Sequence, residues 1–167
     1  ANRHPEQLAL PALPGTVGDV TVERATQVAP GADWQAEAGR DGRNPYAALP
    51  VKAGFCRVEG RIEGSIGFEL WLPQSWNGRL LGAGVGGDAG VYNYRDMAIR
   101  VDQGFATVTT DSGHKIANAR WMRDPKARVD YEHRAVHLTA QAAKALVARF
   151  YGQAPDRSYY LGCSGGG

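Results

Sequence analysis

The sequence predicts an α/β protein whose sheet is mixed at its first edge and parallel later. Three observations carry this prediction. Two alternating apolar segments, 55–62 and 66–73, are separated by a short turn, as in an antiparallel hairpin. A helical pattern at 131–151 lies between two further strand-like runs, which is typical of α/β sheets. Many of the 22 glycines cluster at 82–90 and 162–167, after strand-like runs, where a backbone turns sharply or approaches a ligand.

Composition and charge are those of an ordinary globular domain. The 167 residues are 43% hydrophobic and 22% charged, which is enough for one domain with its own core. The net charge of +2 and the lack of a basic stripe argue against a nucleic-acid partner. No apolar run reaches the ~20 residues that span a membrane. Residues 1–7 lack the pattern of a signal peptide, which could have been removed before this numbering begins.

Residues 1–52 are rich in proline and alanine and predict an extended lead-in that packs on a larger body. Within this segment, 19–28 has a strand-like pattern, whereas 29–50 is rich in the Gly, Pro, Asp and Asn of loops. Residues 53–167 are predicted to form the rest of one domain, because no repeat or second linker divides them.

Regular strands are predicted from residue 55 onward. Segments 55–62 and 66–73 should pair as the antiparallel hairpin. Segment 79–84 is a short apolar strand that leads into the first glycine cluster, and 104–111 is a β-branched, mostly buried strand. In the second strand of the hairpin, one face carries Phe68, Leu70 and Leu72, and the other carries Glu69 and Trp71.

A helix is predicted at 131–151, followed by another strand. Apolar residues recur there at spacings of four and three, which places them on one helix face. These residues are Val136, Ala140, Ala143, Val147 and Phe150. Segment 152–158 breaks the helix. Tyr159 and Tyr160 then begin a buried strand that leads into the last glycine cluster.

The last glycine cluster surrounds a serine in the pattern G-x-S-x-G, at 162–166. A serine that must project from the end of a sheet lies on a sharp, strained strand-to-helix turn, so its neighbours two positions away must be small. The pattern predicts Ser164 as a nucleophile and the Gly165 N–H as a donor to the oxyanion. The alternative is a flexible terminal loop, because glycine-rich turns with serine are common.

The cluster at 82–90 has two interpretations. In α/β-hydrolases a second oxyanion N–H comes from a loop after the third strand, and this cluster follows the third strand counted after the lead-in. The glycines Gly82, Gly84 and Gly87 also fit the G-x-G-x-x-G pattern of dinucleotide-binding proteins, with Asp111 at about the required distance. The preceding hairpin and the short, polar helix expected after the loop argue against this nucleotide alternative.

A serine nucleophile needs a base, and the base needs an orienting carboxylate. Every histidine here precedes Ser164, whereas α/β-hydrolases run in the order Ser, acid, His. The catalytic acid and histidine are therefore expected beyond residue 167, with His114 and His137 as structural residues beneath the site. A metal site is not predicted, because His133 and His137 lack an H-E-x-x-H pattern. The acids and histidines considered are Asp111, His114, Asp130, His133 and His137.

The sequence resembles the tannase and feruloyl esterase family, which also contains the hydrolase of mono(hydroxyethyl) terephthalate. The similarity covers nearly the whole chain from about Leu8. The blocks that carry it are FCRVEG, FELWLPQSWNGRLLGAGVGG, ATVTTDSGH, YEHRAVH, AKALVARFYG and RSYYLGCSGGG. The resemblance implies a secreted or periplasmic serine esterase that cleaves esters of aromatic acids such as gallate and ferulate. It implies the N-terminal part of an α/β-hydrolase core, with a mixed, mostly parallel sheet that ends at the nucleophile elbow.

The resemblance also implies roles for particular residues. Ser164 matches the family's nucleophile, and Gly165 stands where the family usually has threonine, with its amide retained. By position, Gly86 or Gly87 supplies the second oxyanion amide. The glycine loop departs from the family at two positions: Val85 stands where the family usually has asparagine, and Asp88 stands where it usually has an apolar residue.

The two cysteines are expected to remain apart. In the family, the cysteine that matches Cys163 bridges to one beside the catalytic histidine, and the one that matches Cys56 pairs near the N-terminus. Neither partner is present in this chain, so no bond between Cys56 and Cys163 is predicted.

The leading hypothesis is therefore the front part of a serine carboxylesterase, without its lid, catalytic acid and base. Its expected partners are a small aromatic ester and the C-terminal part of the same polypeptide, with no cofactor, metal, nucleic acid or membrane. Two alternatives stay open: a non-catalytic module that binds a ligand or nucleotide on the Gly82–Gly87 loop, and a family member that binds aromatic esters without cleaving them.

Overall fold

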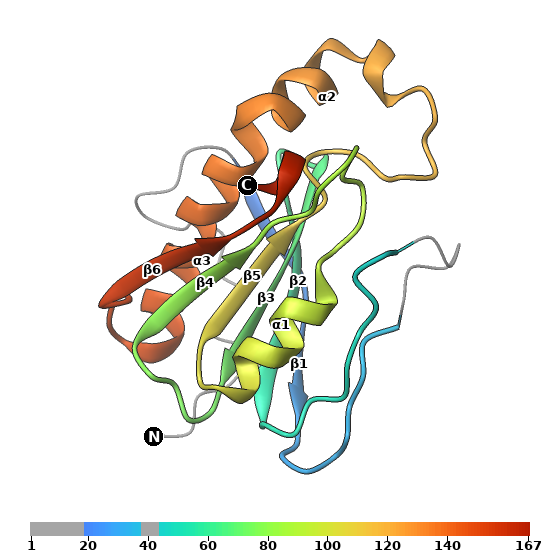
Figure 1. Ribbon diagram of the computed structural model, residues 1–167. Helices are drawn as coiled ribbons and strands as arrows, with labels where there is room; N and C mark the ends of the chain where they lie inside the picture. The colour runs from blue at the N-terminus through green and yellow to red at the C-terminus, as the bar shows by residue number, and fades with distance from the viewer. Residues whose placement is uncertain (1–18, 38–43) are drawn as a thin grey trace.

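The computed structural model describes residues 19–37 and 44–167. They form a six-stranded sheet with helices on both of its faces (Figure 1). The strands lie in the order β1-β2-β3-β5-β4-β6 across the sheet. Their bounds are β1 Val20–Val28, β2 Phe55–Ile62, β3 Ile66–Pro73, β4 Arg79–Ala83, β5 Ala106–Thr110 and β6 Arg157–Leu161. The helices are α1 Tyr94–Asp102, α2 Pro125–Val129 and α3 Ala135–Tyr151, with a π-helical segment η3 Asp130–Arg134 and short 3-10 turns η2 Trp121–Arg123 and η4 Ser164–Gly166.

The mixed sheet predicted from the sequence is confirmed. The pairings β1–β2, β2–β3 and β3–β5 are antiparallel, whereas β4–β5 and β4–β6 are parallel. Antiparallel pairings therefore come first along the chain and outnumber the parallel ones in this part of it. Because β4, β5 and β6 run in the same direction, the segments that follow them meet at one end of the sheet (Figure 1).

The hairpin has the predicted bounds, and its second strand is covered on both faces. Phe68, Leu70 and Leu72 pack in the core beneath α3, and Trp71 packs in the core beneath α1. Burial on both faces explains why the segment is almost continuously apolar. The strand-like run at 19–28 forms β1 and pairs with β2, so this part of the lead-in is continuous with the sheet. Two other parts of the lead-in, 1–18 and 38–43, lie outside the described residues.

The long helix differs from its prediction in where it begins and in which residues it buries. Regular α-helix starts at Ala135, after the π-helical segment, and ends at Tyr151, where Gly152 with a φ of 78° provides a left-handed cap. Val136 is 37% exposed, so its predicted place on the buried face is wrong. Helix α3 packs mainly on β5 and β3, while Val136 and Ala140 lie toward β4 and β6, beside Tyr160. The spacing predicts an apolar stripe, but not how much of its width the sheet covers.

The last strand is also more exposed than the sequence predicts. All five residues of β6 are exposed, including Tyr159 at 43% and Tyr160 at 49%. The reason is its place at the edge of the sheet, where it pairs with β4 alone in the described part of the chain.

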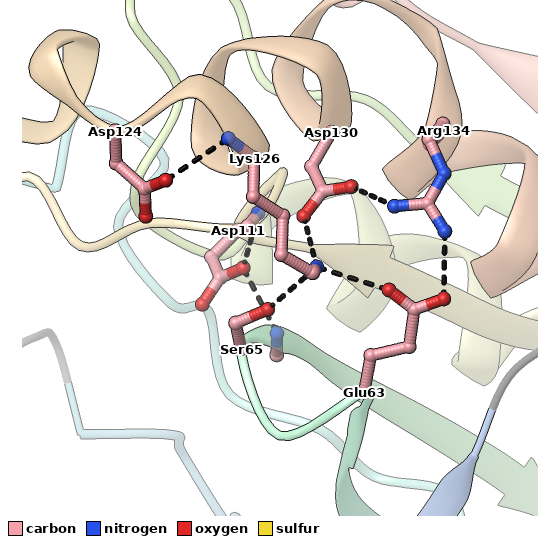
Figure 2. Close-up of polar contacts among 9 residues, drawn as sticks. Glu63, Ser65, Asp111, Asp124, Lys126, Asp130 and Arg134 are labelled. Atoms are coloured by element: carbon pink, nitrogen blue, oxygen red, sulfur yellow. Dashed lines mark hydrogen bonds and ion pairs between the residues drawn. The ribbon is translucent and has the colours of Figure 1, made fainter.

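A network of charged side chains joins the hairpin turn to the start of the long helix (Figure 2). Lys126 Nζ lies 2.6 Å from the buried Asp130 carboxylate and 3.0 Å from that of Glu63. Arg134 bridges the same two carboxylates, and Lys126 also donates to the Ser65 hydroxyl. Because Asp130 is fully buried and satisfied by two cations, the network fixes the π-helical segment relative to the sheet. This segment carries Tyr131, which reaches the glycine loop.

Candidate active site

Ser164 lies on a strained turn just beyond β6. Its φ is 55°, in the left-handed region that residues other than glycine rarely adopt. The turn is closed by a hydrogen bond from the Gly166 N–H to the Cys163 carbonyl at 3.0 Å. Ser164 is exposed to solvent, so its hydroxyl is accessible. The sharp, strained backbone that the G-x-S-x-G pattern predicts is therefore present.

The two glycine clusters pack directly against each other. The Gly84 N–H donates to the Leu161 carbonyl at 2.8 Å. A Cβ on Gly84 would lie 2.1 Å from the Gly166 carbonyl oxygen, and a Cβ on Gly162 would lie 1.8 Å from the same atom. No side chain fits at such distances, so glycine is required at both positions. Residues 162–167 therefore form a packed turn and not the loose loop that the sequence left open.

The structure brings together all four predicted site residues. The position that a Cβ on Gly86 would take lies 4.0 Å from the Ser164 Cβ. The corresponding position on Gly165 lies 3.5 Å from the Gly87 nitrogen and 3.1 Å from the Gly87 oxygen. Backbone amides of the loop after β4 and of the turn after β6 therefore lie beside the serine.

The two candidate loop amides differ in their hydrogen bonding. The Gly86 N–H donates to the Tyr46 hydroxyl at 2.8 Å. The Gly87 N–H has no acceptor in the part of the chain that the structure describes. Gly87 is therefore the better candidate for the second oxyanion donor. Tyr46 was not predicted as a site residue, because a single tyrosine in an irregular segment carries no local signal.

His114 and Asp111 hold backbone near the site. His114 Nε2 donates to the Asp88 carbonyl, and its ring stacks on Trp121 with centroids 3.8 Å apart. The buried Asp111 carboxylate accepts from the N–H groups of Gly67 and Gly113 and pairs with Lys115. The prediction that His114 is structural is thus confirmed.

None of the remaining candidates forms a hydrogen bond or ion pair with Ser164 in the part of the chain that the structure describes. Asp130 belongs to the charged network of Figure 2. His137 is exposed on α3, so the prediction that it lies beneath the site is wrong, because α3 packs through the face of Leu138 and Ala142. His133 is exposed too. Within residues 19–37 and 44–167, no group of His, Cys, Asp or Glu side chains could hold a metal ion.

The pKa of His114 is lowered from its ordinary value of 6.5, chiefly by burial, although the Asp88 carbonyl partly opposes this shift. Its Nδ1 is buried and has no hydrogen-bond partner among the residues that the structure describes. A lowered pKa means that the unfolded chain binds a proton more readily than the folded one. The contribution of neutral His114 to the free energy of unfolding is therefore complete above about pH 6.5. It is lost as the pH falls through the pKa of His114 in the folded state.

We accordingly expect His114→Gln, which keeps an N–H donor, to flatten the decrease in stability between about pH 7.5 and 5.5. Urea unfolding midpoints of the variant and the wild type at both pH values would measure this effect. An equally steep decrease in both proteins would contradict it.

Both cysteines are free thiols in the structure. Cys56 is buried in β2, and burial raises its pKa to about 12, so it is inert at neutral pH. Cys163 is exposed beside Ser164.

The geometry of the glycine loop does not suit a dinucleotide. Helix α1 begins at Tyr94, well beyond Gly87, and is capped by Asn93, whose side chain accepts from the Asp96 N–H. The Asn93 side chain also donates to the Gly84 carbonyl. The loop therefore packs on the serine turn and does not open directly into a helix N-terminus.

The mixed sheet, the serine turn after β6 and the glycine loop after β4 define the class of the chain, which has the α/β-hydrolase fold. A model of the family described as "Tannase and feruloyl esterase" matches residues 51–167. The chain belongs to this family.

Individual relatives agree with this assignment. The chain is 38% identical over 122 residues to the probable feruloyl esterase B-2 of Aspergillus flavus, covering 70% of this chain and 23% of that protein. Feruloyl esterase B from Aspergillus oryzae has a crystal structure that matches 90% of this chain and 31% of its own, with a TM-score of 0.79 at 33% identity. The tannin acyl hydrolase from Aspergillus niger shares the fold, with a TM-score of 0.64 at 22% identity over 96% of this chain and 31% of that one.

The chain thus spans less than a quarter of the length of the Aspergillus flavus relative, at 23%. No helix in the described ranges is both long and apolar enough to cross a membrane.

Proposed function

We propose that this chain supplies the nucleophile and the oxyanion donors of a secreted or periplasmic serine carboxylesterase that hydrolyses esters of aromatic acids. The observation that carries the proposal is the position of Ser164. This residue is exposed, has a left-handed backbone conformation with a φ of 55°, and lies beside the amides of Gly165 and Gly87. The names of the relatives, feruloyl esterase and tannin acyl hydrolase, support an aromatic acid as the acyl group.

The chemistry proceeds through an acyl-enzyme. Ser164 Oγ attacks the ester carbonyl carbon while a histidine base takes the hydroxyl proton. The carbonyl oxygen becomes an oxyanion, which accepts hydrogen bonds from the N–H groups of Gly165 and Gly87. One such donor contributes roughly 10²–10³-fold to kcat. The tetrahedral intermediate then expels the alcohol, which receives the proton, and water releases the acid by the same steps.

The base and its carboxylate are proposed to come from the part of the relatives that this chain does not span. His114 binds the Asp88 carbonyl, and neither His133 nor His137, both exposed, forms a hydrogen bond with Ser164 in the described part of the chain. The edge strand β6, exposed along its length, is the place where the sheet would continue in the complete polypeptide.

A fluorophosphonate probe tests the proposal in the complete polypeptide that carries this chain. We expect labelling of one serine, mapped by peptide mass spectrometry to the peptide with Ser164, together with hydrolysis of methyl ferulate or methyl gallate. Labelling at another residue would refute the assignment of the nucleophile. Binding of a methyl ester without its hydrolysis, and without labelling, would instead favour the non-catalytic alternative.

A further inference from the structure

Three side chains from separate parts of the chain hold three consecutive residues of the glycine loop. Tyr46 lies in the segment before β2, Tyr131 in the π-helical segment and His114 after β5. Their polar atoms bind the Gly86 N–H, the Gly87 carbonyl and the Asp88 carbonyl respectively. We call Tyr46, Tyr131 and His114 the loop clamp. We propose that the loop clamp positions the Gly87 amide for catalysis, an inference that rests on the proposed function.

The hydrogen bonds fix every peptide plane around the Gly87 amide. Tyr46 accepts from the Gly86 N–H at 2.8 Å, which holds the plane before Gly86. The Tyr131 hydroxyl donates to the Gly87 carbonyl at 2.8 Å, which holds the plane after Gly87. The plane between them is held by the Ala89 N–H, which donates to the Gly86 carbonyl at 3.3 Å.

This arrangement sets the direction of the Gly87 N–H, which has no acceptor in the part of the chain that the structure describes. In a trans peptide the C=O and N–H groups of one plane point in opposite directions. Because the Gly86 carbonyl points to Ala89, the Gly87 N–H in the same plane points away from that turn. A Cβ on Gly165 would lie 3.5 Å from the Gly87 nitrogen, so this amide is close to the serine turn.

Glycines need such restraint more than other residues. Glycine has the widest choice of backbone angles, and Gly87 has a φ of 61° with open space where a Cβ would be. An oxyanion donor is effective only when its direction is fixed before the reaction, since a rotating amide would have to be ordered in the transition state.

The clamp residues are themselves well fixed. Tyr131 follows Asp130, which the charged network of Figure 2 holds in place. His114 stacks on Trp121, with ring planes 3° apart. The Tyr46 N–H donates to the side chain of Asn44, whose amide in turn donates to the Tyr92 carbonyl. Each residue of the loop clamp therefore connects the glycine loop to a rigid part of the fold.

The experiment compares Tyr46→Phe, Tyr131→Phe and the double variant with the wild type in the complete polypeptide. Each substitution removes one hydroxyl and keeps the ring. We expect kcat for methyl ferulate or methyl gallate, whichever is hydrolysed, to fall about 10-fold in each single variant, with KM within about twofold. A loss confined to kcat is the sign of an interaction made in the transition state.

The matched control is Tyr151→Phe. Its hydroxyl also donates to a backbone carbonyl, that of Pro73, at the end of β3 remote from the glycine loop. We expect it to lower stability as much as the clamp variants do, but to leave kcat unchanged. Amide exchange of peptide 82–90 should be faster in the clamp variants alone. As a rescue arm, His114→Gln, which keeps a donor toward Asp88, should retain more of kcat than His114→Ala.

The outcomes separate the two proposals. An active wild type whose Tyr46→Phe and Tyr131→Phe variants keep their kcat would overturn the loop clamp alone. A wild type that neither hydrolyses esters nor reacts with the fluorophosphonate would overturn the proposed function and, with it, the clamp.

Discussion

Replacing Ser164 with alanine is expected to lower kcat for aryl ester hydrolysis on the order of 10⁶-fold in the complete polypeptide. The substitution removes the hydroxyl oxygen that we propose forms the bond to the substrate. The oxyanion amides remain, so a residual rate above that of water is expected. Steady-state rates at high enzyme concentration, and the loss of fluorophosphonate labelling, would measure this effect.

The same substitution should leave the fold intact. Alanine has the same steric cost as serine at φ 55°, so the unfolding midpoint should stay close to that of the wild type. Ser158→Ala is the matched control, because Ser158 is an exposed serine on β6, a few residues before the turn. It should retain full activity. If Ser164→Ala kept substantial hydrolysis while it lost labelling, the nucleophile would have to be sought elsewhere.

Gly84→Ala is expected to lower the free energy of unfolding by about 3 kcal/mol and to lower kcat on the order of 10²-fold. A Cβ there would lie 2.1 Å from the Gly166 carbonyl oxygen and 2.7 Å from the Tyr160 hydroxyl oxygen. Gly84 cannot move aside easily, since its N–H donates to Leu161 and its carbonyl accepts from Asn93, each at 2.8 Å. The serine turn must therefore shift, which moves Ser164 relative to the amides that we propose as oxyanion donors.

Urea unfolding and ester hydrolysis would test both parts of this prediction. Gly167→Ala is the matched control in the same turn, because its Cβ would meet its nearest neighbour, the Gly162 carbonyl carbon, at an ordinary 3.5 Å. A Gly84→Ala protein as stable and as active as Gly167→Ala would show that the two glycine clusters do not pack as described.

The local features of the fold could be predicted from the sequence. The hairpin has the predicted bounds, because alternation of apolar residues and a short turn act within a few residues. The serine turn could be predicted for the same reason, since glycine two positions on either side of Ser164 is a steric requirement of the turn itself. The family assignment rests on the same segments, and a model of the family matches residues 51–167.

Features that depend on burial were harder to predict. The apolar spacing in α3 indicates a stripe, yet Val136 on it is 37% exposed, because α3 packs on the middle of the sheet. The aromatic run in β6 suggests burial, yet Tyr160 is 49% exposed at the sheet edge. The π-helical segment before α3 has no periodic signal, although the charged pairs of Asp130 stabilise it.

The sequence by itself determined the serine turn, the glycine loop and the succession of strands along the chain, because these follow from steric rules and periodicities that act over short segments. Only the tertiary structure distinguishes the hydrogen bonding of the Gly86 and Gly87 amides, from which we propose Gly87 as the second oxyanion donor. That choice depends on the Tyr46 hydroxyl, which binds one amide and leaves the other. Its physical basis is a hydrogen bond between residues 40 positions apart, formed only after the chain has closed and packed.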